Sequence, residues 1–269
     1  MEPAIAVKGL RKTYGDNQVL KGLNFQVERG EIFALLGANG AGKTTTLEII
    51  EGLRDHDAGA VTMNGKAGIQ LQSSGLPQNI KAGEAIRLFS EWNSGGIDDA
   101  ALTRLEIPAL KNKQYYMMST GQKRRLHLAL AMIGDPDIIF LDEPTAGLDV
   151  EGRLALHEHI RELKARGKTI VLASHDMAEV EDLSDHIAIL RDGVIAFDGS
   201  VDALTETVGK HFNITVTTDQ GENVYETDDI AAFLLTLLER YREEGVTVTD
   251  ISVDRGTLEQ HFIKIAKGD

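Results

Sequence analysis

Apolar residues recur along the first two hundred positions in two distinct patterns. Three stretches of strand length carry few polar interruptions, which is typical of strands buried on both faces: 32–36, 138–141 and 169–173. Other stretches repeat their apolar residues at helical spacing: 44–52, 121–133 and 150–166. Strands that alternate with helices in this way predict βαβ units and a largely parallel sheet.

Shorter strand-like segments stand at the start of the chain and before residue 200. Residues 4–7 and 22–27 flank a polar turn at Gly15-Asp16-Asn17, which favours an antiparallel pair. Two more short strands flank the turn at 191–193. We therefore expect an α/β fold with a mixed β-sheet core.

The pattern changes near residue 205. Phe212, Ile214 and Val216 alternate as in a half-buried strand, and apolar residues then repeat at helical spacing from 230 to 241, before Gly245. A further strand pair and a helix are expected after that glycine. We predict a main domain at 1–204, with a helical subdomain at about 76–134, and a small α+β accessory domain at 205–269.

Composition narrows the possible functions. The 269 residues include 28 Lys and Arg against 42 Asp and Glu, a net charge of −14, and no cysteine. Without cysteine there is no disulfide framework, thiolate zinc site or cysteine nucleophile. The acidic charge disfavours a broad nucleic-acid contact, which needs clustered Lys and Arg. No signal peptide is expected, because the opening Met1-Glu2-Pro3-Ala4 lacks a basic region and an apolar region after it. No membrane span is expected, because no apolar run reaches about 18 residues.

One segment carries the signature of phosphate binding. It follows a buried strand, precedes a helical pattern and fits G-x-x-x-x-G-K-[ST]. In such a P-loop the glycines let backbone N–H groups surround phosphates, the lysine reaches the β- and γ-phosphates, and the hydroxyl can ligate Mg²⁺. The predicted ATP-binding residues here are Gly37, Ala38, Asn39, Gly40, Ala41, Gly42, Lys43, Thr44 and Thr45.

Two adjacent carboxylates end a later apolar strand, at Asp142 and Glu143. A P-loop enzyme needs an acid at such a position to orient Mg²⁺, and Asp142 suits that role. Successive residues at a strand end point apart, so Glu143 is free to polarise the attacking water. The strand end therefore predicts a metal ligand next to a catalytic base.

Three further motifs identify a family. Between the P-loop and Asp142 lies Met-Ser-Thr-Gly-Gln-Lys-Arg-Arg at 118–125; Pro-Thr-Ala-Gly-Leu-Asp follows at 144–149, and Ser-His at 174–175. In this order the motifs resemble those of the nucleotide-binding subunit of an ABC transporter, over about residues 4–200. The segment at 252–262 is similar to the closing motif of ABC-2 class cassettes, the drug-exporter-like group.

The resemblance implies roles within one ATP site. Tyr14 occupies the position of the aromatic residue that stacks on adenine. Gln72 corresponds to the glutamine that contacts Mg²⁺ and water, with Gln70 as the competing candidate. His175 corresponds to the histidine that contacts the γ-phosphate and positions water, a task suited to its pKa range.

The resemblance also implies that two cassettes act together. Asp149 corresponds to the residue that links the two sites. At the third signature position, Thr120 replaces the usual glycine and adds a β-branched side chain, so turnover is expected to be slow. The residues expected to contact ATP held by the opposite protomer are Ser119, Thr120, Gly121 and Gln122.

The remaining histidines, among them His157 and His159, show no metal-ligand spacing; two positions apart on a helix, these two diverge and are expected to be solvated. The full interpretation is an ATPase that uses ATP and Mg²⁺, forms a homodimer of cassettes and drives a separate transmembrane permease from the cytoplasmic face of the membrane. The alternatives are a soluble ABC-type ATPase acting on nucleic acid or ribosomes, and a regulatory module that closes on ATP without useful turnover.

Overall fold

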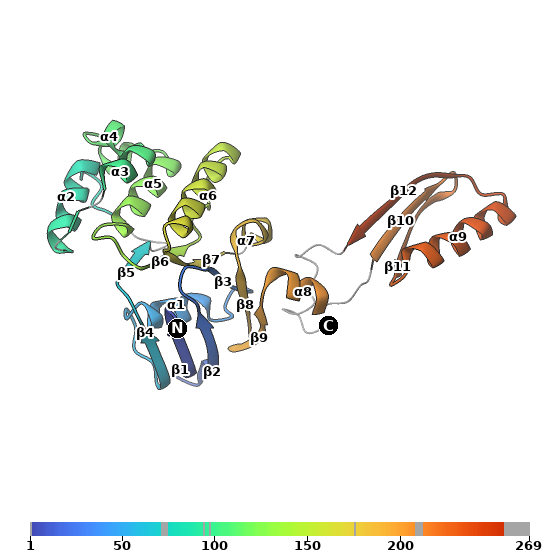
Figure 1. Ribbon diagram of the computed structural model, residues 1–269, viewed down its shortest axis with the longest axis horizontal. Coiled ribbons are helices and arrows are strands. Elements are labelled where there is room, and N and C mark those ends of the chain that lie inside the picture. The colour runs from blue at the N-terminus through green and yellow to red at the C-terminus, as the bar shows by residue number, and fades with distance from the viewer. Residues whose placement is uncertain are drawn as a thin grey trace. The chain divides into compact units, whose positions relative to one another are not determined.

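The computed structural model describes residues 2–70, 75–93, 95–96, 98–174, 176–207 and 212–255. The chain divides into two compact units, Met1–Asp198 and Gly199–Asp269. Figure 1 follows the elements of both in chain order. The residues expected to carry the ATP site all belong to the first unit.

A six-stranded sheet forms the centre of the first unit, in the order β5 (Ala67–Gln70), β6 (Ile138–Asp142), β7 (Thr169–Ala173), β3 (Ile32–Gly37), β8 (His186–Arg191) and β9 (Val194–Gly199). The strands from β5 to β8 pair in parallel. Only two residues, Asp192 and Gly193, separate β8 from β9, and so short a connection makes that pair antiparallel. The expected mixed sheet is confirmed.

A second, antiparallel sheet contains β1 (Ile5–Tyr14), β2 (Asn17–Val27) and β4 (Ala58–Met63), in the order β2-β1-β4. The expected strand pair around Gly15 is confirmed, although these strands are not part of the central sheet. Helix α1 (Lys43–Ile50) lies between the two sheets (Figure 1). Leu20, Leu47 and Phe140 share one buried core across these three layers.

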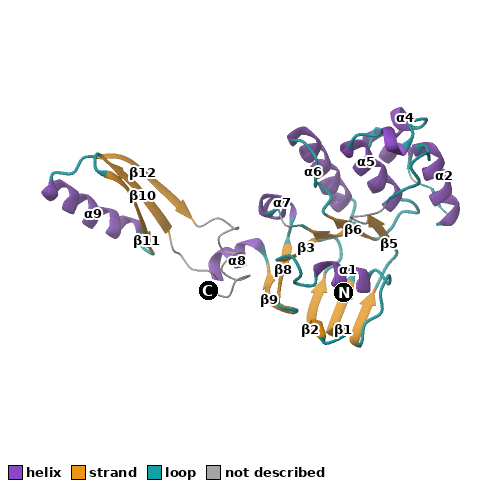
Figure 2. Ribbon diagram, turned by 180° about the vertical axis from the view of Figure 1, so that it is seen from behind, coloured by secondary structure: helices purple, strands orange, loops and turns teal. Residues whose placement is uncertain are grey.

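Helices cover the other side of the six-stranded sheet (Figures 1 and 2). They are α5 (Thr120–Ala131), α6 (Val150–Ala165) and α7 (Met177–Leu183). The helices predicted at 44–52, 121–133 and 150–166 are confirmed as α1, α5 and α6, each starting within one residue of its predicted start. At Gly68 a Cβ atom would lie 2.0 Å from the carbonyl oxygen of Ala131, so glycine allows α5 to pack closely on β5.

Short helices fill the segment between β5 and α5. They are α2 (Ala82–Trp92), α3 (Asp99–Arg104), α4 (Ile107–Leu110) and the 3₁₀ helix η1 (Tyr115–Met117). An isolated bridge between Lys81 and Gln114 brings the two ends of this segment together. The signature residues at the start of α5 therefore come directly after this group of short helices.

The second unit contains α8 (Val201–Thr207), β10 (Phe212–Thr218), β11 (Gly221–Thr227), α9 (Ile230–Glu244) and β12 (Val248–Arg255). Its sheet is antiparallel in the order β11-β10-β12. Leu237 and Tyr241 of α9 pack on Ile214 and Val216.

The expected strand at 212 and the helix at 230 are confirmed, and Gly245 ends α9 with a φ of 71°. One strand, β12, follows that glycine in the described residues. The rest of the expected strand pair and helix fall on residues 256–269, outside the described part. Among the described helices, none has both the length and the apolar character needed to cross a membrane.

Candidate functional site

The P-loop occupies the turn between β3 and α1. Gly37 is buried at the end of β3, and a Cβ atom there would lie 2.5 Å from the carbonyl oxygen of Leu190. Gly42 has a φ of 109° and precedes the first helical residue, Lys43. These two positions require glycine because the backbone packs too closely, or turns too sharply, for a side chain. The loop residues Ala38, Asn39 and Gly40 are exposed to solvent.

Lys43 folds back over this loop. Its Nζ donates hydrogen bonds to the carbonyl oxygens of Gly37, at 2.6 Å, and Ala38, at 3.4 Å. Burial lowers the pKa of Lys43, although the nearby carboxylates of Glu143 and Asp142 oppose that shift. A partly desolvated ammonium group is favourable for binding an anion such as a phosphate. Thr44 is exposed and Thr45 half-buried on the first turn of α1.

The paired carboxylates stand at the end of β6. Burial, followed by the charge of Glu143, raises the pKa of Asp142. A cation would relieve this crowding of negative charge. Asp142 carries carboxylate oxygens and Thr44 a hydroxyl, which are the ligand atoms that Mg²⁺ prefers. The described residues contain no cluster of three or more His, Asp or Glu that forms a ready-made cation site.

Glu143 adopts a backbone conformation that sequence reasoning did not anticipate. Its φ is 49°, in the left-handed region, and its N–H donates a 2.9 Å hydrogen bond to the carbonyl oxygen of Ala173 at the end of β7. The residue is 9% exposed. A non-glycine residue in this conformation carries backbone strain, which is common where a side chain is held for function.

The parallel pairing brings several predicted residues to one edge of the sheet. Strands β3, β6 and β7 end at the P-loop, at Asp142 and just before Ser174. Their carboxyl ends lie at the same edge, which is where open α/β sheets bind ligands. Gln70 ends β5 at this edge too, buried and without a hydrogen-bond partner for its amide among the described atoms. Gln72 and His175 lie outside the described residues.

Tyr14 ends β1, one residue before the turn into β2, and 40% of its surface is exposed. Its hydroxyl accepts a 2.6 Å hydrogen bond from Nη1 of Arg54. The aromatic ring of Tyr14 is therefore accessible to solvent and fixed by Arg54, and it is not part of the core.

The signature residues surround a separate groove of about 550 Å³. Ser119 caps α5: its hydroxyl accepts from the N–H of Gln122, and its own N–H donates to the side chain of Gln122. Thr120, Gly121 and Leu148 also line the groove. No P-loop residue lines it in the described chain, so the signature and the P-loop of one chain do not form a single pocket.

Asp149 also lines this groove and caps α6. Its Oδ1 accepts a 2.8 Å hydrogen bond from the N–H of Gly152. At Gly147 a Cβ atom would lie 3.2 Å from Cγ2 of Thr120. The methyl group of Thr120 therefore lies against the loop that leads to Asp149.

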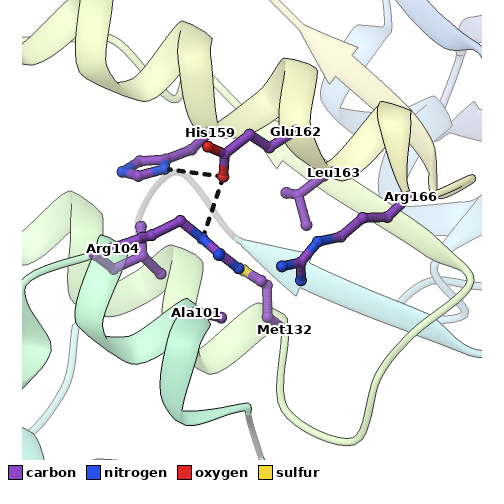
Figure 3. Close-up of a pocket in the computed structure, with 8 residues that line it drawn as sticks. Ala101, Arg104, Met132, His159, Glu162, Leu163 and Arg166 are labelled. Atoms are coloured by element: carbon purple, nitrogen blue, oxygen red, sulfur yellow. Dashed lines mark ion pairs between the residues drawn. The ribbon is translucent and has the colours of Figure 1, made fainter.

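A smaller pocket lies between α3 and α6 (Figure 3). Oε2 of Glu162 pairs with Nε of Arg104 at 3.2 Å and faces Nδ1 of His159 at 3.9 Å. Glu162 thus pairs with Arg104 and faces His159, and Met132 and Leu163 line the space beside them. Arg166 also lines this pocket, which lies at a packing junction between helices.

A buried polar network joins α6 and α7 to the segments that follow β6 and β7. The sequence analysis did not predict it. Glu179 of α7 is 1% exposed and accepts hydrogen bonds from the hydroxyls of Ser174 and Thr145. His157 lies beside it, with Nδ1 at 2.9 Å from Asp182. The expectation of a solvated His157 is wrong: the residue is 4% exposed, because α7 covers this face of α6.

Comparisons with known proteins agree with these features. The ABC transporter family matches residues 20–146. An ABC transporter ATP-binding protein of Methanocaldococcus jannaschii is 38% identical over 75% of this chain and 79% of its own length. A Nod factor export ATP-binding protein I of Burkholderia orbicola is also 38% identical, over 76% of this chain and 73% of its own.

Two more similarities extend the comparison to the tail and to the fold. A daunorubicin resistance ATP-binding protein of Streptomyces coeruleorubidus is 29% identical over 100% of this chain and 97% of its own. A solved structure of an ATP-binding subunit of an ABC transporter is 28% identical, covers 76% of this chain and 93% of its own, and superposes with a TM-score of 0.69.

Proposed function

The chain belongs to the family of ABC transporter ATP-binding proteins and is an ATPase of that family, and from this premise we propose that it drives export through a separate transmembrane subunit. The observation that carries the proposal is the meeting of the P-loop, Asp142 and Glu143 at one sheet edge, while the signature lines a different groove. This arrangement suits two chains that complete each other's ATP sites.

Within one chain, the P-loop and its lysine hold the phosphates of ATP. Thr44 and Asp142, with Gln72 in the segment that follows β5, are the proposed Mg²⁺ ligands. Bound there, Mg²⁺ would neutralise charge that develops on the phosphates. Tyr14 stacks on the adenine ring.

Glu143 is the proposed base, and it orients the water that attacks the γ-phosphate. It follows Asp142 directly in the chain, and its backbone is in the left-handed region. His175 is the proposed second contact to the γ-phosphate. The strand that leads to it, β7, is bonded to Glu143 through Ala173, which supports a common position for both residues.

Between chains, the proposed partner is a second copy. Ser119, Thr120, Gly121 and Gln122 would contact ATP held by that copy, with the N-terminus of α5 directed at the phosphate. Asp149 would link the two sites, since it lines the same groove and caps the start of α6. Closing two such cassettes excludes water from the reacting phosphate, and hydrolysis allows them to open.

Export, a transmembrane partner and a position on the cytoplasmic face rest on the relatives. Two of them are named for export or drug resistance, and the daunorubicin resistance protein matches the tail as well as the cassette. A soluble ATPase that acts on nucleic acid is not favoured by these relatives or by the charge of −14. A regulatory module without turnover would not need a strained catalytic acid at Glu143.

The test uses Glu143→Gln in the full chain. We expect ATP to bind as in the unsubstituted protein, hydrolysis to fall by at least about 100-fold, and a closed dimer to accumulate in size-exclusion chromatography. Hydrolysis at the unsubstituted rate would refute the catalytic assignment.

Purification from native membranes in mild detergent tests the partner: a multispanning protein should accompany the chain, and ribosomes or nucleic acid in its place would favour the soluble alternative.

A further inference from the structure

We propose that Arg54 is a positioning residue for the base of the bound nucleotide, because it fixes the Tyr14 ring to the helix that begins at the P-loop. The inference rests on the proposed function, since it takes Tyr14 as the adenine-stacking residue. Nothing in the motif pattern of the sequence points to Arg54, which lies in the turn after α1.

Arg54 connects the base site with the phosphate site through two short contacts. Its Nη1 donates to the hydroxyl of Tyr14 at 2.6 Å, and its Nε donates to Oε2 of Glu48, also at 2.6 Å. Glu48 belongs to α1, the helix that starts at Lys43. Arg54 therefore links the ring that would hold the base to the helix that presents the phosphate-binding lysine.

The guanidinium group of Arg54 lies over the Tyr14 ring at cation–π distance without stacking flat on it. Its central carbon lies 5.5 Å from the ring centroid, whereas a group stacked flat on the ring would lie at about 3.5–4 Å. With Nη1 at the hydroxyl, this distance places the guanidinium at the hydroxyl end of Tyr14. Nζ of Lys12 also lies over the ring, at 5.4 Å from the centroid, and neither cation is in flat contact with it. A base can then stack on the ring face while Arg54 keeps its contact.

The backbone near Tyr14 is held by other residues. Oδ2 of Asp57 accepts a 2.6 Å hydrogen bond from the N–H of Thr13, and Oδ1 accepts a 3.1 Å bond from Nζ of Lys12. The N–H of Asp57 donates to the carbonyl oxygen of Arg11. Loss of the Arg54 side chain therefore leaves the end of β1 in place and affects the orientation of the ring.

The physical effect is pre-organisation. Immobilising a free side chain when a ligand binds costs affinity, and a ring that is already held avoids that cost. We expect loss of Arg54 to weaken ATP binding about two- to tenfold, which is the range for ordering one side chain. Binding of a triphosphate that lacks a base should not change.

The experiment measures dissociation constants by calorimetry on the full chain, for MgATP and for inorganic tripolyphosphate with Mg²⁺. Arg54→Gln should weaken ATP alone, and Arg54→Lys should recover part of the loss because lysine can still donate to the hydroxyl. Added to Tyr14→Leu, Arg54→Gln should cause no further loss. Arg87→Gln is the matched control, since Arg87 is 77% exposed in its side chain on α2.

The outcomes separate this inference from its premise. If Tyr14→Leu weakens ATP and Arg54→Gln does not, the base site stands and the role of Arg54 is refuted. Equal weakening of ATP and tripolyphosphate by Arg54→Gln would also refute it, because the effect would then be general charge attraction. If Tyr14→Leu leaves ATP affinity unchanged, the assignment of Tyr14 fails and the inference fails with it.

Discussion

The hydroxyl of Ser174 donates a 2.5 Å hydrogen bond to Oε2 of Glu179, whose side chain is wholly shielded from solvent. The same carboxylate accepts from the hydroxyl of Thr145, and burial raises its pKa. Thr145 follows Glu143 by two positions, and Ser174 directly precedes His175. One buried carboxylate thus connects the two segments that carry the proposed catalytic residues.

Glu179→Gln should reduce the turnover of ATP more than its binding. The amide keeps the volume of the side chain but loses the negative charge and replaces one acceptor oxygen with an NH2 donor, so its bonds to the two hydroxyls are weaker and the two segments lose a strong common anchor. We expect kcat to fall about 10- to 100-fold, as for small misplacements of catalytic groups, with little change in the dissociation constant for ATP. Glu181→Gln, at an exposed position of the same helix, is the control. A kcat equal to that of the control would remove this role.

His186 should make stability depend on pH in the alkaline range. Hydrogen bonds to Asp198 and Glu31 raise the pKa of His186 to about 9, from an ordinary value of 6.5. Because the folded pKa is the higher one, the stabilisation is complete below pH 6.5 and is lost as the pH rises to 9. Allowing for partial exposure, His186→Gln should lower the free energy of unfolding at pH 6 by about 1–2 kcal/mol.

Urea denaturation at pH 6, 7.5 and 9 measures that effect. The difference between His186→Gln and the unsubstituted chain should shrink as the pH rises. His56→Gln, at an exposed position, should show no such trend. A difference that stays constant with pH would mean that the ion pairs of His186 do not stabilise the fold.

Glu51 should act in the opposite way, as a site where substitution stabilises the protein. Burial, then the charges of Asp142 and Glu48, raise the pKa of Glu51 to about 7 from 4.5. The fold therefore favours the protonated carboxyl, and stability falls as the pH rises from 4.5 through 7. Glu51→Gln removes this ionisation and should raise the free energy of unfolding at pH 8 by about 1–2 kcal/mol.

Thermal unfolding at pH 5 and pH 8 tests Glu51→Gln. The gain should appear at pH 8 and be absent at pH 5. Glu28→Gln provides an exposed carboxylate for comparison. Equal effects of Glu51→Gln at the two pH values would show that the carboxyl is not strained by its surroundings.

Thr120→Gly should raise turnover. The β-branched side chain stands in the signature groove, where the family pattern has glycine, and it limits how closely a phosphate approaches the backbone of α5. A twofold rise in kcat needs only about 0.4 kcal/mol of transition-state stabilisation, so we expect at least that much. Steady-state ATPase assays measure it, and Thr120→Ser separates the methyl group from the hydroxyl. If turnover is unchanged in both variants, the side chain of Thr120 does not limit the rate of ATP hydrolysis.

The local pattern of residues was sufficient for the buried strands, for the helices α1, α5 and α6 and for the motif order. A buried strand next to a helical repeat identifies the P-loop, since its glycines and Lys43 stand in one short segment. The starts of α1, α5 and α6 follow from the same periodicity. Such features depend on neighbours in the chain, and the sequence therefore determined the fold class, the P-loop and the paired acids at the end of β6.

Only the tertiary structure decided which side chains share an environment. Tyr14 meets Arg54 across 40 positions, His157 meets Asp182 across 25, and His186 meets Glu31 across 155. Burial, hydrogen bonding and charge then set the pKa of Glu51 and hold Glu179 between two loops. These properties arise from distances between atoms that chain folding brings together, and a linear pattern carries no measure of those distances.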